Sequence, residues 1–289
     1  MSWRLYRLVF GLRSPVHAGS LPVGNILRTR PYVAGKVFWG AATAGLVAGL
    51  KKPFSPESYR EMGKTVKERL VFGYFFPRSE RDAGVRVDGQ DAEFRDRFEY
   101  AFLDTYASTA VNSNAGAAES NSLHEIEVIR CWTRPAAGER PAHVLLEGHL
   151  MARDEAPVRC SEQDVVVEGV SLLDCLSSIQ IGGKRGYGFG KLELKEFKET
   201  DTVFGAAFCA DGTVFLERGE PAAAHVQMTG GEEPEQGTPE VFVGREWRED
   251  LGFGAGQHLS RPQFCWAPGV RFRQPRRFRI GPFGIWEPA

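Results

Sequence analysis

The first 56 residues of this 289-residue chain contain no aspartate or glutamate, since Glu57 is the first acidic residue. The whole chain nevertheless has a formal net charge of −1, which argues against a uniformly basic nucleic-acid binder. Any surface that binds anions must therefore arise from segregation of charge within the chain. The basic residues of this acid-free segment are Arg4, Arg7, Arg13, Arg28, Arg30, Lys36, Lys51 and Lys52.

Charge is segregated at the other end of the chain as well. A basic cluster near the C-terminus follows an acidic loop that is interrupted by proline and glycine. The chain is therefore neutral in total but has two basic ends. The cluster comprises Arg271, Arg273, Arg276, Arg277 and Arg279, and the loop contains Glu232, Glu233, Glu235 and Glu240.

Cysteine pairs and long apolar runs are also lacking. The five cysteines are widely spaced, without a CxxC pair or a histidine at zinc-finger spacing, so we expect reduced, mostly buried thiols and no metal site. The most apolar run, Val37 to Leu50, is about 14 residues long and falls short of the roughly 20 that span a bilayer. The N-terminus lacks the long apolar region of a signal peptide, because Arg13 and Pro15 end the short apolar run Leu8 to Leu12. We expect a cytoplasmic protein with no membrane contact.

The N-terminal third predicts one strand and two helices. Ser2 to Leu12 reads as a strand that is apolar on both sides, and the Gly-, Pro- and Asn-rich Ser14 to Pro31 reads as a loop. Tyr32 to Leu50 predicts a helix of small residues, and Glu57 to Arg69 predicts a more polar one.

The middle third predicts an antiparallel hairpin, then a helix and a strand. Leu123 to Arg134 and His143 to Arg153 alternate as strands around a turn at Pro135 to Pro141. Val165 to Ile179 has a spacing closer to a helix, and a strand begins at Lys191.

This order of elements predicts an α+β fold. We expect a ferredoxin-like (RRM-like) antiparallel sheet with helices on one face over residues 1–200. Residues 201–289 are less regular and predict an appended sub-domain, or an incomplete and degraded second copy. Leu251 to Gly256 (LGFGAG) resembles a worn repeat of an earlier glycine-rich segment.

That earlier segment, Ile181 to Leu192 (IGGKRGYGFGKL), combines five glycines, two aromatic residues and three cations. A nucleotide-binding P-loop or dinucleotide loop requires other glycine spacings and leads into a helix, whereas this segment leads into a strand. Two interpretations stay open on the residues alone. One is a structural hairpin; the other is an RNA-contacting loop whose cations bind phosphates and whose rings stack on bases or riboses.

The segment resembles the glycine-rich loop of the CRISPR-associated RAMP superfamily. That loop runs hydrophobic-Gly-Gly-Lys-Arg-x-x-Gly-aromatic-Gly, and it is matched here by Ile181, Gly182, Gly183, Lys184, Arg185, Gly188, Phe189 and Gly190. Leu12 to Gly19 is similar to the first strand of the family, which ends in a His-x-Gly turn, and Tyr32 to Leu46 is similar to its Pro-Gly helix start. Gly116 to Ile129 resembles a later strand, so the resemblance covers roughly residues 1 to 200.

The resemblance implies a CRISPR RNA-binding subunit of a multi-subunit, type III RNA-guided effector complex in antiviral defence. Its partners would be CRISPR RNA, target RNA and other effector subunits, with no cofactor. Base pairing of the guide would read the sequence, while the protein contacts shape and backbone. The predicted RNA-binding residues are Gly182, Gly183, Lys184, Arg185, Gly186, Tyr187, Gly188, Phe189 and Lys191, together with Arg28, Arg30 and Lys36.

The resemblance favours a subunit that holds RNA over one that cuts it. Family members that cut target RNA use an aspartate after the His-x-Gly turn, and this chain has no acidic residue there. A cap-like or terminal subunit is therefore expected, with no catalytic residue assigned. The alternative is a RAMP endonuclease that cleaves target RNA or processes repeat RNA. His17 is its general acid-base candidate but matches the structural turn, and Asp82, Asp88 and Asp91 stay open.

The C-terminal segment RFRQPRRFR also has two interpretations. It is either a solvated basic tail or a strand that contacts the guide or a neighbouring subunit, with Phe272 and Phe278 packed inward. The arrangement of the residues favours the strand.

Overall fold

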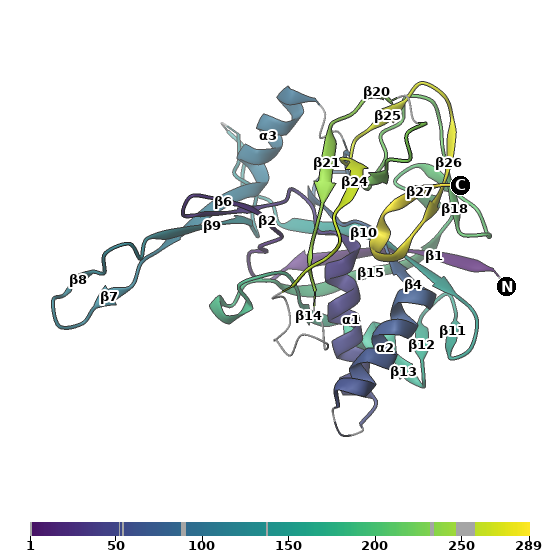
Figure 1. Cartoon of the computed structure of the whole chain (residues 1–289), viewed down its shortest axis with the longest axis horizontal. Helices are drawn as coiled ribbons and strands as arrows, with labels where there is room; N and C mark the ends of the chain where they lie inside the picture. Colours follow the sequence, from purple (N-terminus) through teal and green to yellow (C-terminus); the bar gives the residue numbers. More distant parts are fainter. Residues whose placement is uncertain are drawn as a thin grey trace.

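The computed structural model describes residues 2–51, 53, 55–87, 91–136, 138–231, 234–246 and 258–289. The fold is mixed α+β, as the sequence predicts, with a central sheet between a layer of helices and a C-terminal layer of strands (Figure 1). Several residues that carry predictions lie outside the described part: Lys52, Asp88, Glu232, Glu233 and residues 251–256.

The central sheet is antiparallel throughout. Its order is β14 (Ser178–Gln180), β15 (Lys191–Thr200), β1 (Trp3–Leu12), β10 (Val144–Arg153) and β4 (Leu70–Phe72), and β5 (Phe76–Ser79) also pairs with β10. The strand predicted at Ser2 to Leu12 is thus confirmed as β1. Its apolar character on both sides has a physical cause, because both faces of β1 are covered.

Helices cover one face of this sheet. Three helices lie there: α1 (Gly35–Gly49), α2 (Pro56–Arg69) and the short α4 (Leu172–Leu176). Phe38, Ala42 and Leu46 of α1 recur every four residues and pack on Tyr6, Leu8 and Phe10 of β1. Ser55 and Ser58 form a capping box that begins α2, with Pro56 in its first turn. Both predicted helices are confirmed.

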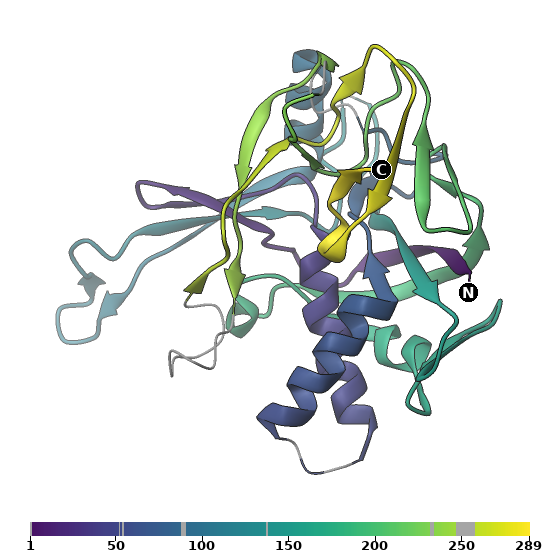
Figure 2. The same ribbon diagram turned by 45° about the vertical axis from the view of Figure 1, so that its right-hand side comes forward.

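A second sheet projects away from the body as a long arm (Figures 1 and 2). It contains β2 (Gly19–Val23), β3 (Ile26–Thr29), β9 (His124–Ile129) and β6 (Leu103–Ser108), in this order. The two-residue strands β7 (Val111–Asn112) and β8 (Ala117–Ala118) form its tip, and α3 (Ala92–Phe102) leads into β6.

The C-terminal residues form a third sheet. Its order is β16 (Thr202–Val203), β17 (Ala206–Phe208), β18 (Thr213–Leu216), β26 (Arg276–Ile280), β27 (Trp286–Pro288), β19 (Val226–Gln227), β24 (Gln263–Trp266) and β21 (Pro239–Phe242). Val214, Phe278 and Trp286 of this sheet share a core with Leu5 and Met151 on the second face of the central sheet. Phe272 and Phe278 are both buried, as the strand interpretation of RFRQPRRFR expects.

Smaller elements complete the fold. They are β11 (Val158–Cys160), β12 (Val165–Val167), β13 (Val170–Ser171), β20 (Pro234–Gln236) with β25 (Arg271–Phe272), β22 (Arg245–Glu246) with β23 (His258–Leu259), and the 3₁₀ turns η1 (Arg185–Tyr187) and η3 (Pro282–Gly284). The described cysteines are all free thiols, of which Cys265 is buried and the others are partly exposed. No helix of the described chain is long and apolar enough to cross a bilayer.

Four local predictions are wrong. The predicted loop Ser14 to Pro31 contains the β2–β3 hairpin, because β9 supplies a partner for β3 from far along the chain. The predicted hairpin at residues 123–153 is split: β9 joins the arm and β10 the central sheet, and a single bridge, Trp132 to His143, links the two segments. Val165 to Ile179 is not one helix: β12 and β13 come first, the short helix α4 follows, and β14 begins at Ser178. The glycine-rich segment consequently joins two strands, β14 and β15, rather than a helix and a strand.

One buried histidine makes the stability of this fold depend on pH. His149 of β10 is 4% exposed and lies edge-on to Phe204 at 4.6 Å between ring centroids, and burial lowers its pKa from 6.5 to about 4. A histidine that stays neutral in the folded state but ionises in the unfolded state makes stability fall as the pH drops below about 6.5.

We therefore expect the free energy of unfolding to fall by about 2 kcal/mol between pH 7 and pH 5 through His149 alone. Urea unfolding at the two pH values measures this loss, and His149→Leu should remove most of it. The buried His225, whose pKa is also lowered by burial, adds a loss of the same sign that His149→Leu leaves in place. An unchanged pH dependence in His149→Leu would contradict the assignment.

Candidate nucleic-acid interface

The glycine-rich segment is fixed to the body at both ends. The backbone N–H of Ile181 donates to the carbonyl of Gly190 at 2.9 Å, which closes the loop at its base. The N–H of Gly183 donates to the carbonyl of His17 at 2.9 Å, and that of Gly190 donates to the carbonyl of Pro15 at 2.7 Å. The His-x-Gly turn and the glycine-rich loop, which are far apart in the sequence, therefore form one structural unit.

The glycines of the loop serve two different purposes. A Cβ atom on Gly190 would lie 1.9 Å from the carbonyl oxygen of Ile181, and one on Gly182 would lie 2.6 Å from that of His17. Both positions also have positive φ, so packing and backbone conformation demand glycine there. A Cβ atom on Gly186 would meet nothing within 4 Å, and the φ of Gly186 is not positive. Nothing in the described part of the chain requires glycine at position 186.

The two aromatic residues of the loop have different surroundings. Phe189 is 7% exposed and packs against Ile126 and Val128 of β9, so it anchors the loop to the base of the arm. Tyr187 is 49% exposed, and its ring lies 6.2 Å from that of Phe189 in a stacked arrangement. Tyr187 is therefore the ring of this loop that has a face open to a ligand.

The three cations of the loop lie on or near its exposed side. Lys184 adopts a left-handed conformation with φ of 57°, and its Nζ lies 5.6 Å from the centroid of the Tyr187 ring. Arg185 and Lys191 are exposed. Within the described part of the chain, none of the three forms an ion pair with a carboxylate. Their charges are available to an external anion.

The three predicted N-terminal cations are dispersed. Arg28 lies on β3 next to Leu27, which contacts the Phe189 cluster, and its Nε is 3.3 Å from Oε2 of Glu127. Lys36 begins α1, and its Nζ lies 5.3 Å from the ring centroid of Phe283 in η3. Arg28 is thus near the loop, while Lys36 contacts the C-terminal part of the chain.

Arg30 belongs to a buried polar cluster. Its guanidinium donates to Tyr32 Oη at 2.7 Å and to Glu240 Oε1 at 2.6 Å, and it also lies over the Phe242 ring. His225, which is fully buried, shares hydrogen bonds with Tyr74 at 2.7 Å and Glu240 at 3.0 Å. Burial by itself raises the pKa of Glu240, but His225 and Arg30 lower it to about 2. In this arrangement Arg30 fastens the C-terminal sheet to the N-terminal segment.

The candidate catalytic groups are engaged in structural contacts. His17 is buried, and its Nδ1 lies 2.8 Å from the carbonyl oxygen of Glu127. Asp82 accepts from the backbone N–H of Ser79, and Asp91 caps the N-terminus of α3 by accepting from that of Phe94. Among the described residues, no three His, Cys, Asp or Glu side chains gather in a group that would hold a metal ion.

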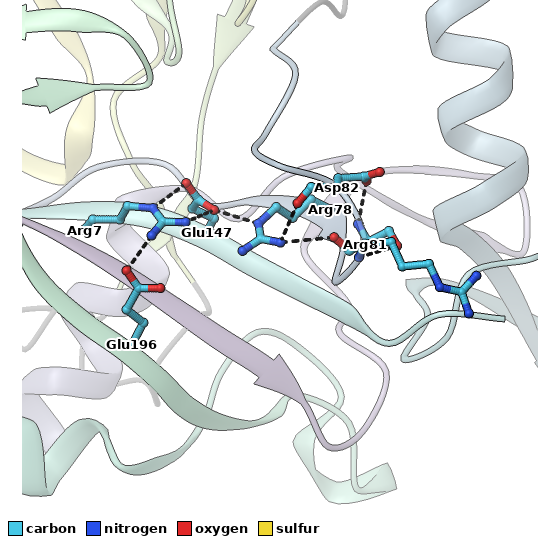
Figure 3. Close-up of polar contacts among 7 residues, drawn as sticks. Arg7, Arg78, Arg81, Asp82, Glu147 and Glu196 are labelled. Atoms are coloured by element: carbon cyan, nitrogen blue, oxygen red, sulfur yellow. Dashed lines mark hydrogen bonds and ion pairs between the residues drawn. The ribbon is translucent and has the colours of Figure 1, made fainter.

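A partly buried network of ion pairs lies on the second face of the central sheet (Figure 3). Glu147 of β10 accepts from Arg7 of β1 at 2.8 Å and from Arg78 of β5 at 2.7 Å, and Arg7 also pairs with Glu196 of β15. Burial by itself raises the pKa of Glu147, but the hydrogen bonds from Arg7 and Arg78 lower it below its ordinary value. Two carboxylates and two guanidiniums thus cancel across this face, which leaves the glycine-rich loop as the more cationic surface.

Removing the shared carboxylate of this network should be costly for the fold. We expect Glu147→Leu to lower the free energy of unfolding by about 3 kcal/mol, because it leaves Arg7 and the nearly buried Arg78 without their main partner. Urea unfolding measures the loss. The matched control is Glu93→Leu, which breaks the exposed pair with Arg97 on α3 and should change stability by at most about 0.5 kcal/mol. Equal effects of the two substitutions would contradict a stabilising role for the network.

Sequence reasoning missed the cations of α2. Burial raises the pKa of Tyr59, and the charge of Arg185 acts against that rise, so the glycine-rich loop lies within electrostatic range of α2. Lys64 and Lys67 lie on the same helix as Tyr59 and line a cavity with it. In the sequence, the three-residue spacing of Lys64 and Lys67 on a polar helix could have indicated a basic binding surface. The same spacing is also typical of a helix face that is exposed to solvent.

Comparison by sequence finds no relative of this chain, whereas comparison by structure finds similar chains. No family model matches the chain, and no curated protein matches its sequence. Solved structures of the type III-B Cmr-beta complex contain similar chains. In the complex bound to cognate target RNA and AMPPnP the TM-score is 0.49 at 9% identity, over 92% of this chain and 86% of that chain. The complex bound to cognate target RNA gives 0.41 at 9% identity, and the apo state gives 0.38 at 8% identity; each match covers 66% of this chain and 96% of the other.

Proposed function

We propose that this protein binds CRISPR RNA as a structural subunit of a type III RNA-guided effector complex. The observation that carries the proposal is the exposed side of the glycine-rich loop. There Lys184 and Arg185 form no ion pair with a described residue, Tyr187 has an open face, and Gly186 leaves room for close approach of a ligand backbone. Cations that contact phosphates next to a ring that stacks on a base are the usual elements of single-strand recognition.

A ferredoxin-like core for residues 1–200 belongs to the same proposal. The spatial order β15-β1-β10-β4 is antiparallel, and helices connect β1 to β4 and β10 to β14. This order agrees with a β-α-β-β-α-β arrangement in which both helical connections lie on one face. Residues 201–289 then form the appended sub-domain.

The protein would hold RNA rather than cut it, as a cap or terminal subunit. The segment before Glu57 has no carboxylate, Asp82 and Asp91 are bonded to backbone N–H groups, and His17 is buried against β9. In this role the protein's partners are the guide, the target RNA paired with it, and neighbouring effector subunits.

Incubating the full chain with a labelled, repeat-containing RNA, first without and then with Mg²⁺, tests the proposed function. The expected result is retention of intact RNA in both conditions. Absence of retention would overturn the RNA-binding role. Discrete cleavage products would replace the structural role with that of an endonuclease.

A further inference from the structure

A cavity of about 740 Å³ lies outside the glycine-rich loop, between α2 and the last strands of the chain. Helix α2 forms one wall, from Tyr59 to Arg69, and residues 279–282 form another. Trp3 of β1 and Arg153 of β10 also line it, from two inner strands of the central sheet. The cavity is therefore built at the junction of the N-terminal and C-terminal parts.

Positive charge dominates this cavity. Its lining includes two acidic residues, Glu68 and Glu287, against six cations: Arg60, Lys64, Lys67, Arg69, Arg153 and Arg279. Glu155 pairs with both Arg69 and Arg153, at 2.6 and 2.9 Å. Lys64 and Arg279 form no ion pair with any residue that the structure describes. In a chain with a net charge of −1, such a concentration of cations favours an anionic ligand.

Aromatic rings lie among these cations. Trp3, Trp39 and Tyr59 line the cavity. The Nε1–H of Trp39 donates to the carbonyl of Gly63 at 2.8 Å, and its ring meets that of Phe283 edge-on at 5.3 Å, so its orientation is fixed. Lys67 also lies over Phe283, with its Nζ 5.3 Å from the ring centroid. Fixed rings beside cations suit the bases and phosphates of a single nucleic-acid strand.

The cavity and the loop lie toward opposite ends of β1, since Trp3 lines the cavity and Leu12 pairs with Leu192 at the end of the loop. Tyr59 lines the cavity, while its Oη lies 3.5 Å from the carbonyl oxygen of Gly40 in α1. Arg185 of the glycine-rich loop acts electrostatically on the same Tyr59 side chain. A strand that contacts both Arg185 and the cavity would have to run along α2, from Tyr59 toward Lys64 and Lys67. Arg279 also brings a member of the C-terminal arginine cluster into the lining of the cavity.

We propose that this cavity is a second RNA subsite, which receives the strand bound by the glycine-rich loop after it passes α2. The inference rests on the proposed function and extends it. Lys64 and Arg279 contact phosphates, and Trp39 and Tyr59 present rings to a base. A free nucleotide or an acidic peptide of a neighbouring protein would satisfy part of this chemistry, but an RNA strand supplies phosphates for the cations and bases for the rings along the whole of α2 from Tyr59 to Arg69.

Charge reversal at the cavity tests the subsite. In the full chain, Lys64→Glu with Lys67→Glu should lower the affinity for a single-stranded RNA about tenfold or more, measured by fluorescence anisotropy. Arg279→Glu should act in the same direction. Replacing Lys64 with alanine should reduce the slope of log affinity against log salt by about 0.7, the share of one phosphate contact. The matched control is Arg159→Glu with Lys198→Glu, two exposed cations on β11 and β15 that should leave the affinity within about twofold.

RNA length separates the two subsites. The RNA is shortened stepwise from each end in turn. Shortening from one of the two ends should reach a length at which the cavity variants bind as well as the wild type. At that length the variant of Lys184 and Arg185 should still bind weakly. Cavity variants that bind RNAs of every length like the wild type would overturn the second subsite while leaving the proposed function intact. Saturable binding of ATP or of a polyglutamate peptide that depends on Lys64 and does not compete with RNA would also overturn it. If neither the cavity variants nor the variant of Lys184 and Arg185 lost affinity for RNA, that result would instead argue against the proposed function.

Discussion

Replacing Lys184 and Arg185 together with glutamate should lower the affinity of the full chain for single-stranded RNA by on the order of a hundredfold at about 0.1 M salt. The two side chains form no ion pair with described carboxylates, so their charge is available to phosphates. The substitution removes the cations that would bind phosphates and adds repulsion at the same place. Fluorescence anisotropy across a salt series measures the affinity, and its log-log slope should become shallower by about 0.7 for each phosphate that the variant no longer neutralises.

The double substitution should leave the fold intact. Both side chains lie on the outer side of a loop whose closure depends on backbone N–H groups and on Gln180, whose amide donates to the carbonyls of Arg185 and Phe189. Thermal unfolding of the variant should therefore match that of the wild type. An intact variant that still retains RNA with wild-type affinity would show that the loop is structural, which is the alternative that the sequence leaves open.

Substitution of Gly190 should destabilise the fold, whereas substitution of Gly186 in the same loop should not. Gly190→Ala places a Cβ atom 1.9 Å from the carbonyl oxygen of Ile181 at a position with φ of 85°, so the loop must open. We expect a loss of about 3 kcal/mol or more in the free energy of unfolding, measured in urea. The Cβ atom of Gly186→Leu meets no described atom within 4 Å, so this substitution should change stability by less than about 0.5 kcal/mol.

The RNA affinity of Gly186→Leu completes this comparison. Because the leucine side chain occupies the open surface between Arg185 and Tyr187, it should hinder the approach of an RNA backbone and lower the affinity about tenfold. Gly84→Leu is the matched control, since its Cβ atom also meets nothing within 4 Å and its position lies outside the loop. Unimpaired RNA binding by Gly186→Leu would mean that the backbone of the loop does not touch the ligand.

Elements with strong local signals could be predicted from the sequence. The apolar residues on both sides of Ser2 to Leu12 indicated the strand β1, and the run of small residues in Tyr32 to Leu50 indicated the helix α1. Elements whose partner lies far along the chain could not. The β2–β3 hairpin looked like a loop because glycine, proline and asparagine dominate it, and its pairing depends on β9. The apolar residues of β12 and β13 fit a helical spacing by chance, since short apolar runs are ambiguous.

The same distinction between local signals and long-range contacts applies to the candidate site. The motif alone indicated that Lys184, Arg185 and Gly186 share one loop, and the structure shows them there on its outer side. The burial of Arg30 was not predictable, because its partner Glu240 lies 210 residues away. The cavity of α2 was missed for a similar reason, since Lys64 and Arg279 meet only through the packing of the C-terminal sheet on the central sheet.

Photo-crosslinking of a 4-thiouridine-containing RNA to the full chain, followed by mass spectrometry of the linked peptides, identifies the surface that contacts the RNA. The account predicts crosslinks in residues 181–192, with Tyr187 as the main site because its ring is the exposed one. Bound RNA that crosslinks to other surfaces, such as the Arg7–Glu147–Arg78 face, and leaves residues 181–192 unlabelled would contradict it.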